Sequence, residues 1–225
     1  MAKRGVIIVA GGSGSRMQSA LPKQFLMLGG MPVVARTINT CSEALPGAEI
    51  VVVLPEEHIA LWKNLSARFD VAPHAIVAGG KERFYSVLNG INALSEEVEY
   101  IAVHDGVRAM ATKKLVIRTM LAAEEHDAVI PVIDVVDSYR RVDGDESVIV
   151  PRSELRIVQT PQVFSAEVLR RAYAAEFSPA FTDDASVVEA AGGHITLVDG
   201  ERTNVKLTTP EDMAYAEWLI ESGAI

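Results

Sequence analysis

Short apolar runs alternate with amphipathic stretches along the first half of the chain. The apolar runs are continuous and rich in β-branched residues, which is typical of strands covered on both faces of a sheet. They predict strands at 6–10, 50–54, 75–77, 100–103 and 128–132.

The stretches between these runs predict helices near 32–42, 56–68, 83–94 and 112–126. In the third stretch the apolar residues share one helical face, and they are Phe84, Val87, Leu88, Ile91 and Leu94. Regular alternation of strand and helix predicts a three-layer, Rossmann-like α/β domain with a mostly parallel sheet. Such sheets bind ligands at the carboxyl ends of their strands.

The alternation stops after Pro131. Residues 134–160 are polar, with a turn signal at Asp143-Gly144-Asp145, so we expect an extended β-arm inserted near 134–158. The pattern then predicts helices at 165–177 and 183–191 and a strand at 195–198.

The last predicted helix has a clear start. Thr209 is the expected N-cap and Pro210 the first helical residue. Because the sequence has neither a repeat nor a linker, we expect a single domain over residues 1–225.

Composition limits the class of protein. Of 225 residues, 49% are hydrophobic and 23% charged, the mixture of an ordinary folded protein. The longest apolar run is too short for a membrane helix. The single cysteine, Cys41, excludes an internal disulfide and a cysteine-rich zinc site, and predicts a cytoplasmic location. A net charge of −9 disfavours nucleic-acid binding but leaves a locally basic pocket for a small phosphorylated ligand open.

A glycine-rich segment directly after the first predicted strand carries the strongest chemical signal. It consists of Ala10, Gly11, Gly12, Ser13, Gly14 and Ser15. A dinucleotide-binding fingerprint would need a third glycine where Met17 stands, and a P-loop would need a closing Gly-Lys-Ser/Thr. A tight turn without a ligand is another interpretation. Arg16 and Lys23 favour a polyphosphate, because backbone N–H groups and two cations would face the same anion.

This loop, followed by Pro-Lys-Gln-Phe, resembles the signature of the sugar-nucleotide nucleotidyltransferases, and in particular their cytidylyltransferase branch. Further matching segments follow in order: Gly79–Arg83 with Ser86, Val103–Arg108, Arg156–Gln162, Thr182–Ser186 and Asn204–Asp212. Together they resemble the 2-C-methyl-D-erythritol 4-phosphate cytidylyltransferase family of non-mevalonate isoprenoid synthesis. The resemblance runs from about residue 5 to about residue 220.

The resemblance implies a role for each matching residue. Arg16 and Lys23 match the pair that stabilises charge on the nucleotide phosphates. Arg152 and Lys206 match the pair that positions the acceptor phosphate. The implied nucleotide-binding positions are Ala10, Gly11, Gly12, Ser13, Gly14, Ser15, Gly80, Ser86, Asp105 and Gly106. The implied acceptor-binding positions are Asp105, Arg108, Ser138, Arg152, Thr160 and Lys206.

The resemblance also implies CTP and a small sugar-alcohol phosphate as substrates. Mg²⁺, or Mn²⁺, would be held mainly by the triphosphate, with Asp105 as a candidate ligand. Because Arg152 lies on the predicted arm, the resemblance implies a homodimer in which each arm reaches the neighbouring subunit's site.

The sequence departs from the resemblance at a few positions. Lys81 stands where an acid is common, Gly106-Val107 replaces a more usual Ala-Ala or Ala-Val, and Ala109 stands where proline is common. Ribitol 5-phosphate remains an alternative acceptor. A nicotinamide-dependent oxidoreductase and a non-catalytic nucleotide-binding protein are the competing classes.

Other polar residues fit structural roles. Asp183 and Asp184 are expected to begin a helix, since acids suit a helix N-terminus. His104 is expected to be structural, and Cys41 a small core residue.

Overall fold

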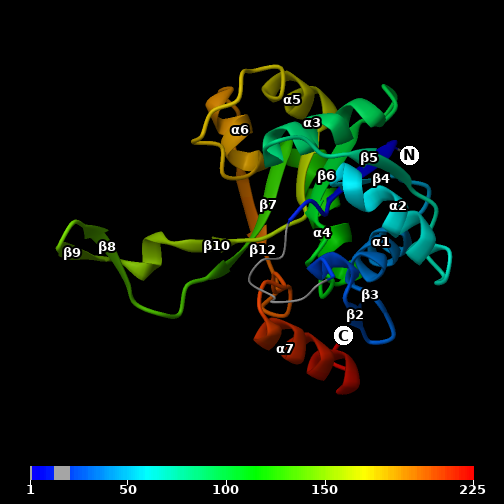
Figure 1. The fold of residues 1–225 in the computed structure, drawn as a ribbon. Coiled ribbons are helices and arrows are strands. Elements are labelled where there is room, and N and C mark those ends of the chain that lie inside the picture. The colour runs from blue at the N-terminus through cyan, green and yellow to red at the C-terminus, as the bar shows by residue number, and fades with distance from the viewer. Residues whose placement is uncertain (1, 13–20) are drawn as a thin grey trace.

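A computed structural model describes residues 2–12 and 21–225 of the chain. The central sheet has the strand order β10-β7-β11-β6-β1-β4-β5, with β12 also paired to β7 (Figure 1). Its strands are β1 (Arg4–Val9), β4 (Glu49–Leu54), β5 (Ala75–Ala78), β6 (Tyr100–Asp105), β7 (Ala128–Asp134), β10 (Arg156–Val158), β11 (Gln162–Ser165) and β12 (Thr196–Asp199).

Most of these strands are parallel, as the continuous apolar runs predict. β1 is parallel to both β4 and β6, β4 is parallel to β5, and β12 is parallel to β7. β11 lies antiparallel between β6 and β7, and β10 is antiparallel to β7. The predicted α/β fold with a mostly parallel sheet is confirmed.

Helices cover both faces of the sheet and make it the middle of three layers. They are α1 (Val33–Ala44), α2 (Glu56–Ser66), α3 (Arg83–Ala93), α4 (Lys113–His126), α5 (Ala166–Ala172), α6 (Asp184–Ala190) and α7 (Pro210–Glu221). On β1, Val6 and Ile8 belong to a core shared with α1, α2 and α4, whereas Ile7 belongs to a core shared with α3, α5 and α6. Successive side chains of a strand point to opposite faces of the sheet. Because helices cover both faces, both sets of positions are apolar.

Helix α7 packs outside these two cores. Its Ala216 and Leu219 join Leu207, Val107 and Met110 in a third apolar cluster. Thr209 caps the helix and forms a capping box with Asp212, and Pro210 occupies the first turn, as predicted. This cluster connects the end of the chain to the segment that follows β6.

The predicted arm is present and projects from the body (Figure 1). Strands β8 (Tyr139–Asp143) and β9 (Glu146–Val150) form an isolated hairpin, followed by the 3-10 turn η3 (Arg152–Glu154). In this hairpin Gly144 has a φ of 58°, the left-handed conformation that the turn signal required.

The second half of the chain differs from the sequence-based prediction in two details. The helix predicted for 165–177 ends at Ala172, and beyond this end Phe177 packs against Phe84 of α3. Strand β11 was not predicted. It is only four residues long, and its antiparallel place between β6 and β7 is set by long-range pairing.

Among the described residues, no helix is both long and apolar enough to cross a membrane.

Candidate active site

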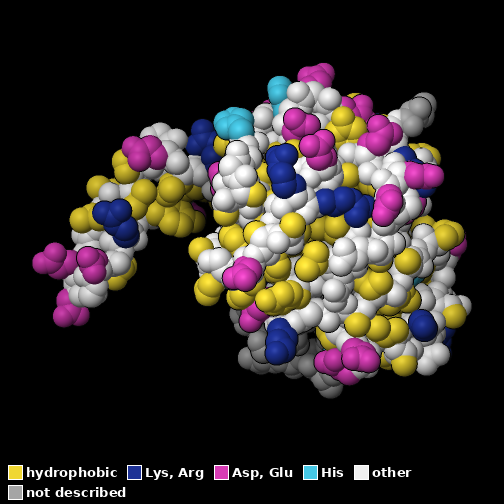
Figure 2. Space-filling view, turned by 90° about the horizontal axis from the view of Figure 1, so that it is seen from above, with side chains coloured by type: hydrophobic (Ala, Val, Ile, Leu, Met, Phe, Trp, Pro, Cys, Tyr) yellow, Lys and Arg dark blue, Asp and Glu magenta, His cyan; other side chains and the backbone are white. Residues whose placement is uncertain are grey.

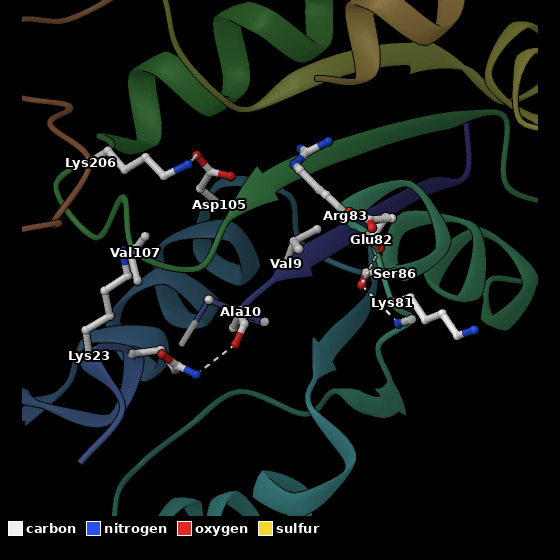
Figure 3. Close-up of a pocket in the computed structure, with 14 residues that line it drawn as sticks. Val9, Ala10, Lys23, Lys81, Glu82, Arg83, Ser86, Asp105, Val107 and Lys206 are labelled. Atoms are coloured by element: carbon white, nitrogen blue, oxygen red, sulfur yellow. Dashed lines mark hydrogen bonds and ion pairs between the residues drawn. The ribbon is translucent and has the colours of Figure 1, made fainter. Parts of the chain in front are cut away.

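A pocket of about 280 Å³ opens at the carboxyl edge of the parallel strands (Figure 3). Segments that follow β1, β5 and β6 converge there, as expected for an open α/β sheet. The residues lining it are Val9, Ala10, Gly11, Gly12, Lys23, Gln24, Gly80, Lys81, Glu82, Arg83, Ser86, Asp105, Val107 and Lys206.

The end of β1 is fixed by backbone hydrogen bonds to its two neighbours. Ala10 N–H donates to the Val53 carbonyl at 2.9 Å, and Gly106 N–H donates to the Val9 carbonyl at 2.8 Å. A Cβ on Gly106 would lie 2.9 Å from the Cβ of Ala10, so glycine allows the two segments to approach. Gly106 thus shapes the pocket floor without itself lining it.

Asp105 is the buried carboxylate of the pocket. Its Oδ2 atom lies 3.1 Å from Lys206 Nζ and 3.3 Å from Arg108 Nε. Burial alone would raise the pKa of Asp105, but Lys206, Arg83 and Arg108 outweigh this effect and lower the pKa to about 2. Asp105 is therefore ionised at neutral pH and holds Lys206 at the pocket (Figure 3).

A cluster of buried polar groups is hydrogen-bonded around Asp105. The Thr160 hydroxyl accepts the Asp105 N–H at 3.0 Å and lies 2.7 Å from His104 Nδ1. Asn204 Nδ2 donates to the Thr160 carbonyl at 2.9 Å, and Arg108 donates to the Asn204 carbonyl at 2.8 Å. Thr160 and Arg108 therefore do not line the pocket themselves but contact Asp105, which does.

His104 itself has a structural position. It is buried beside Thr160, and burial lowers its pKa to about 4. The imidazole is therefore neutral at physiological pH, which agrees with the structural role expected from the sequence.

The segment after β5 forms the opposite wall. Gly80 N–H donates to Ser86 Oγ at 3.1 Å, and Ser86 Oγ donates to the Glu82 carbonyl at 3.2 Å. A Cβ on Gly80 would lie 2.3 Å from the Cβ of Tyr85, so only glycine fits this close turn without a shift. In Figure 3 the Lys81 side chain extends away from Asp105.

Arg83 connects this wall to α6. Its guanidinium makes paired hydrogen bonds of 2.8 and 2.6 Å with the carboxylate of Asp184, which also accepts the Tyr173 hydroxyl at 2.6 Å. Burial would lower the pKa of Arg83, but the charge of Asp184 outweighs this effect and raises it. The predicted helix start is confirmed, because Asp183 is the N-cap of α6.

Lys23 enters the pocket from the 3-10 turn η2 (Lys23–Phe25). Its side chain is largely buried, and a Cβ on Gly12 would lie 3.7 Å from Lys23 Cε. The neighbouring Gln24 donates from Nε2 to the Ala10 carbonyl at 2.9 Å. The turn is thus attached to the end of β1, beside the glycine-rich segment.

The structure brings together one part of the predicted site and separates another. Ala10, Gly11, Gly12, Lys23, Gly80, Ser86, Asp105 and Lys206 line one pocket. Ser138 and Arg152 do not line it; both are exposed on the arm, where Arg152 donates to the Val136 carbonyl at 2.8 Å. Ser13, Gly14, Ser15 and Arg16 lie outside the described residues.

Sequence reasoning overlooked three polar residues of the pocket. Gln24, Glu82 and Arg83 line it, and none was predicted to have a role. Gln24 stands inside the Pro-Lys-Gln-Phe motif, and Arg83 inside the Gly79–Arg83 segment, so the signal was their position within the quoted motifs.

No group of three or more His, Cys, Asp or Glu side chains in the described part of the chain could hold a metal ion. Asp105 offers an ionised, hard oxygen donor at the pocket, and Glu82 lines the opposite wall. This donor set fits a divalent cation bound mainly by a polyphosphate rather than by the protein.

Comparison with known proteins assigns the chain to a family. Residues 5–222 match the family model described as "IspD: 2-C-methyl-D-erythritol 4-phosphate cytidylyltransferase". The chain belongs to this family. A relative of that name from Bacteroides fragilis is 47% identical over 219 residues, covering 96% of this chain and 99% of the relative. One from Bacteroides thetaiotaomicron is 46% identical, covering 97% and 100%.

Solved structures of family members share the fold. A 4-diphosphocytidyl-2C-methyl-D-erythritol synthase from Anaerococcus prevotii has a TM-score of 0.83 at 29% identity, covering 98% of this chain and 96% of that one. The 2-C-methyl-D-erythritol 4-phosphate cytidylyltransferase from Thermus thermophilus has a TM-score of 0.77 at 31% identity, covering 98% and 100%. The expected family membership is therefore confirmed over nearly the whole chain.

Proposed function

We propose that the pocket at the carboxyl edge of the sheet transfers a cytidylyl group from CTP to 2-C-methyl-D-erythritol 4-phosphate. The products are 4-diphosphocytidyl-2-C-methyl-D-erythritol and pyrophosphate. Family membership supplies the reaction, and one observation carries the assignment to this pocket. Lys23 and the Lys206–Asp105 pair line the same cavity from separate elements, so cations are available to two anionic reactants.

The reaction is a displacement at the α-phosphorus of CTP. An oxygen of the acceptor phosphate forms the new P–O bond, and the bond between the α-phosphorus and the bridging oxygen breaks as pyrophosphate leaves. A phosphate monoester is largely ionised at neutral pH, so no general base is required. Catalysis then depends on holding two anions together and stabilising the charge that develops.

The nucleotide side consists of the β1 loop, η2 and the wall after β5. Lys23 offers a cation to the triphosphate, and the backbone of Gly11 and Gly12 approaches it without side-chain obstruction. Gly80 and Ser86 form the proposed contact with cytosine. By its place in the sequence, Arg16 is the second proposed cation on this side, and Ser13, Gly14 and Ser15 continue the proposed phosphate-binding loop.

The acceptor side is organised by Asp105. It holds Lys206 at the pocket and is itself a candidate partner for a sugar hydroxyl. Arg108 and Thr160 hold it in place through hydrogen bonds to its carboxylate and its backbone N–H, respectively. Lys206 therefore is the proposed contact of this chain with the acceptor phosphate.

A Mg²⁺ or Mn²⁺ ion is the proposed cofactor. It would be carried mainly by the triphosphate, with Asp105 as the candidate protein ligand, directly or through water. When bound, it would neutralise charge on the triphosphate and favour departure of pyrophosphate.

The arm points to a homodimer. Its apolar side chains are exposed along its length (Figure 2) and include Val136, Tyr139, Val142, Val148 and Ile149. A two-stranded hairpin is marginally stable alone in water, and an exposed apolar patch favours a partner. We propose that Arg152 and Ser138 reach the acceptor in a second copy's pocket. The proposed compartment is the cytoplasm.

Pyrophosphate release tests the proposal. The protein is incubated with CTP and Mg²⁺, with 2-C-methyl-D-erythritol 4-phosphate in one set of wells and ribitol 5-phosphate in another. We expect release with the first acceptor. Release with ribitol 5-phosphate alone would contradict the proposed acceptor while keeping the nucleotide chemistry.

A charge-removing variant tests the pocket itself. Lys23→Ala should lower turnover by about two to three orders of magnitude with folding intact, since one preorganised transition-state donor contributes several kcal/mol. Lys63→Ala removes an exposed lysine from α2 and serves as the control. Equal turnover in the two variants would remove Lys23 from the mechanism.

A further inference from the structure

Lys23 is presented by a very short element that needs support from its surroundings. The turn η2 is closed by the Phe25 N–H donating to the Pro22 carbonyl at 2.9 Å and the Leu26 N–H donating to the Lys23 carbonyl at 3.2 Å. A single 3-10 turn has weak intrinsic stability. The position of Lys23 therefore depends on what holds Gln24 and Phe25.

Phe25 is the buried anchor of this turn. Its side chain is 1% exposed, and its ring stacks on Trp62 of α2 with 5.8 Å between centroids and 12° between planes. The Phe25 and His58 rings also make an edge-to-face contact, with 6.0 Å between their centroids. Rigid aromatic packing of this kind restricts the turn because the close-packed interior resists displacement.

Trp62 is itself fixed by a directional hydrogen bond. The buried indole donates from Nε1 to His74 Nε2 at 3.0 Å. An indole can only donate, so His74 Nε2 is the acceptor and its Nδ1 carries the proton. That Nδ1 then donates to the Ala72 carbonyl at 2.7 Å. His74 is thus held in one tautomer and one orientation.

The segment that carries His74 is attached to α1. Asn39 donates from Nδ2 to the Asp70 carbonyl at 2.8 Å and accepts the Ala72 N–H at 2.9 Å. A continuous series of contacts therefore runs from α1 through His74, Trp62 and Phe25 to Lys23. None of these supporting side chains lines the pocket.

We propose that Trp62 and His74 are positioning residues for the transfer reaction, acting through Phe25 on the location of the Lys23 ammonium group. This inference rests on the role proposed above for Lys23. A displacement of about 1 Å at a catalytic group can cost on the order of a hundredfold in rate. The Trp62–His74 hydrogen bond thereby acts on catalysis without contact with either substrate.

Substitutions at His74 separate positioning from general stability. His74→Leu removes the acceptor for the indole N–H, whereas His74→Gln provides an amide oxygen that can accept it. His74 is only partly buried, so both variants should fold. We expect kcat to fall by about tenfold or more in His74→Leu with KM for CTP nearly unchanged, and most of the rate to return in His74→Gln.

A core variant provides the matched control. Met120 is 1% exposed and lies in the same apolar core, but on α4. Met120→Ala should lower thermal stability with little change in kcat. If Met120→Ala lowers kcat as much as His74→Leu, loss of stability explains the effect and positioning is overturned.

A double-mutant cycle then tests the path through Lys23. In a Lys23→Ala background, adding His74→Leu should leave the slow residual turnover unchanged, because the group being positioned is absent. If His74→Leu lowers kcat by the same factor in the Lys23→Ala background as in the native protein, the positioning role of Trp62 and His74 is overturned, while the proposed role of Lys23 stands. If Lys23→Ala itself turns over at the native rate, the proposed function of Lys23 fails instead.

Discussion

A single buried carboxylate, Asp105, sets the charge distribution of the pocket. Lys206 and Arg108 both lie within hydrogen-bonding distance of the same oxygen, and Arg83 adds a more distant positive charge. The local environment is therefore cationic and preorganised, although the chain as a whole has a net charge of −9. This arrangement suits anionic reactants, because local charge rather than net charge determines what a pocket binds.

The acid stability of the protein should depend on Asp105. Its pKa is about 2 in the folded state against an ordinary value of 3.8, so the carboxylate stabilises the fold above about pH 4 and this contribution is lost as the pH falls towards 2. A shift of this size corresponds to about 2 kcal/mol. Urea unfolding at pH 5 and pH 3 should show the difference between native protein and Asp105→Asn shrinking at the lower pH. Asp70→Asn, at an exposed site, is the control, and a pH-independent difference for Asp105→Asn would contradict the prediction.

At the residue scale, the sequence predicts the site residues that stand within or directly after a recognisable motif. Lys23, Asp105 and Lys206 follow recognisable segments, and all three line the pocket. The partnership of Arg83 with Asp184 was not predicted, because the two residues are 101 positions apart and no local pattern marks the pair. Trp62 and His74 were overlooked because they reach the pocket only through other side chains.

At the scale of elements, α3 is central because it contacts both the sheet and the pocket. It packs its apolar face on β1 and carries Arg83 and Ser86 at its N-terminal end. This helix was predicted almost to the residue, since its periodicity is clear over the whole length. Strand β11 was missed because a four-residue run has no periodicity that separates strand from helix or loop.

Close packing of α3 against β1 should make Gly90 intolerant of a side chain. A Cβ there would lie 2.5 Å from Ile7 Cγ2, so Gly90→Ala must push the helix away from the sheet. We expect a loss of about 1–3 kcal/mol in the free energy of unfolding, the usual cost of overpacking. Asn92→Ala, on the exposed side of the same helix, should be neutral or slightly stabilising. Chemical denaturation of both variants is the measurement; greater stability of Gly90→Ala would contradict the close approach.

The connection between α3 and α6 should depend on the Arg83–Asp184 pair. Asp184 is fully buried, and its carboxylate accepts both Arg83 nitrogens and the Tyr173 hydroxyl. Asp184→Asn leaves the guanidinium without its counter-charge, so we expect a loss of about 3 kcal/mol in the free energy of unfolding. Glu167→Gln breaks the exposed Arg171–Glu167 pair and should cost less than about 1 kcal/mol. If the two variants lose a similar free energy of unfolding, the buried Arg83–Asp184 pair contributes no more to stability than an exposed one, and the prediction is wrong.

At the scale of the whole molecule, the body and the arm divide the predicted site between them. The body gathers eight of the predicted residues at one pocket, while the arm holds Ser138 and Arg152 away from it. The arm could be predicted from its polar composition and turn signal, but the sequence pattern alone could not say which pocket it serves. Its exposed apolar side chains are consistent with the homodimer proposed above, in which a second copy would cover them.

Mixed dimers can decide whether the arm completes a neighbour's pocket. Arg152→Met and Lys23→Ala are each expected to be nearly inactive as pure preparations. If Arg152 serves the partner's site, a mixed dimer contains one pocket with native Lys23 and native Arg152, so random exchange of equal amounts should restore about a quarter of native activity. Mixing Lys23→Ala with Lys206→Ala is the control, because both residues belong to the same chain's pocket and every mixed site then lacks one of them. Recovery in the first mixture and none in the second would place Arg152 in the partner's site. Absence of recovery in both, after subunit exchange has been verified by mass spectrometry, would mean that each chain uses its own Arg152 and that the arm must fold back towards its own body.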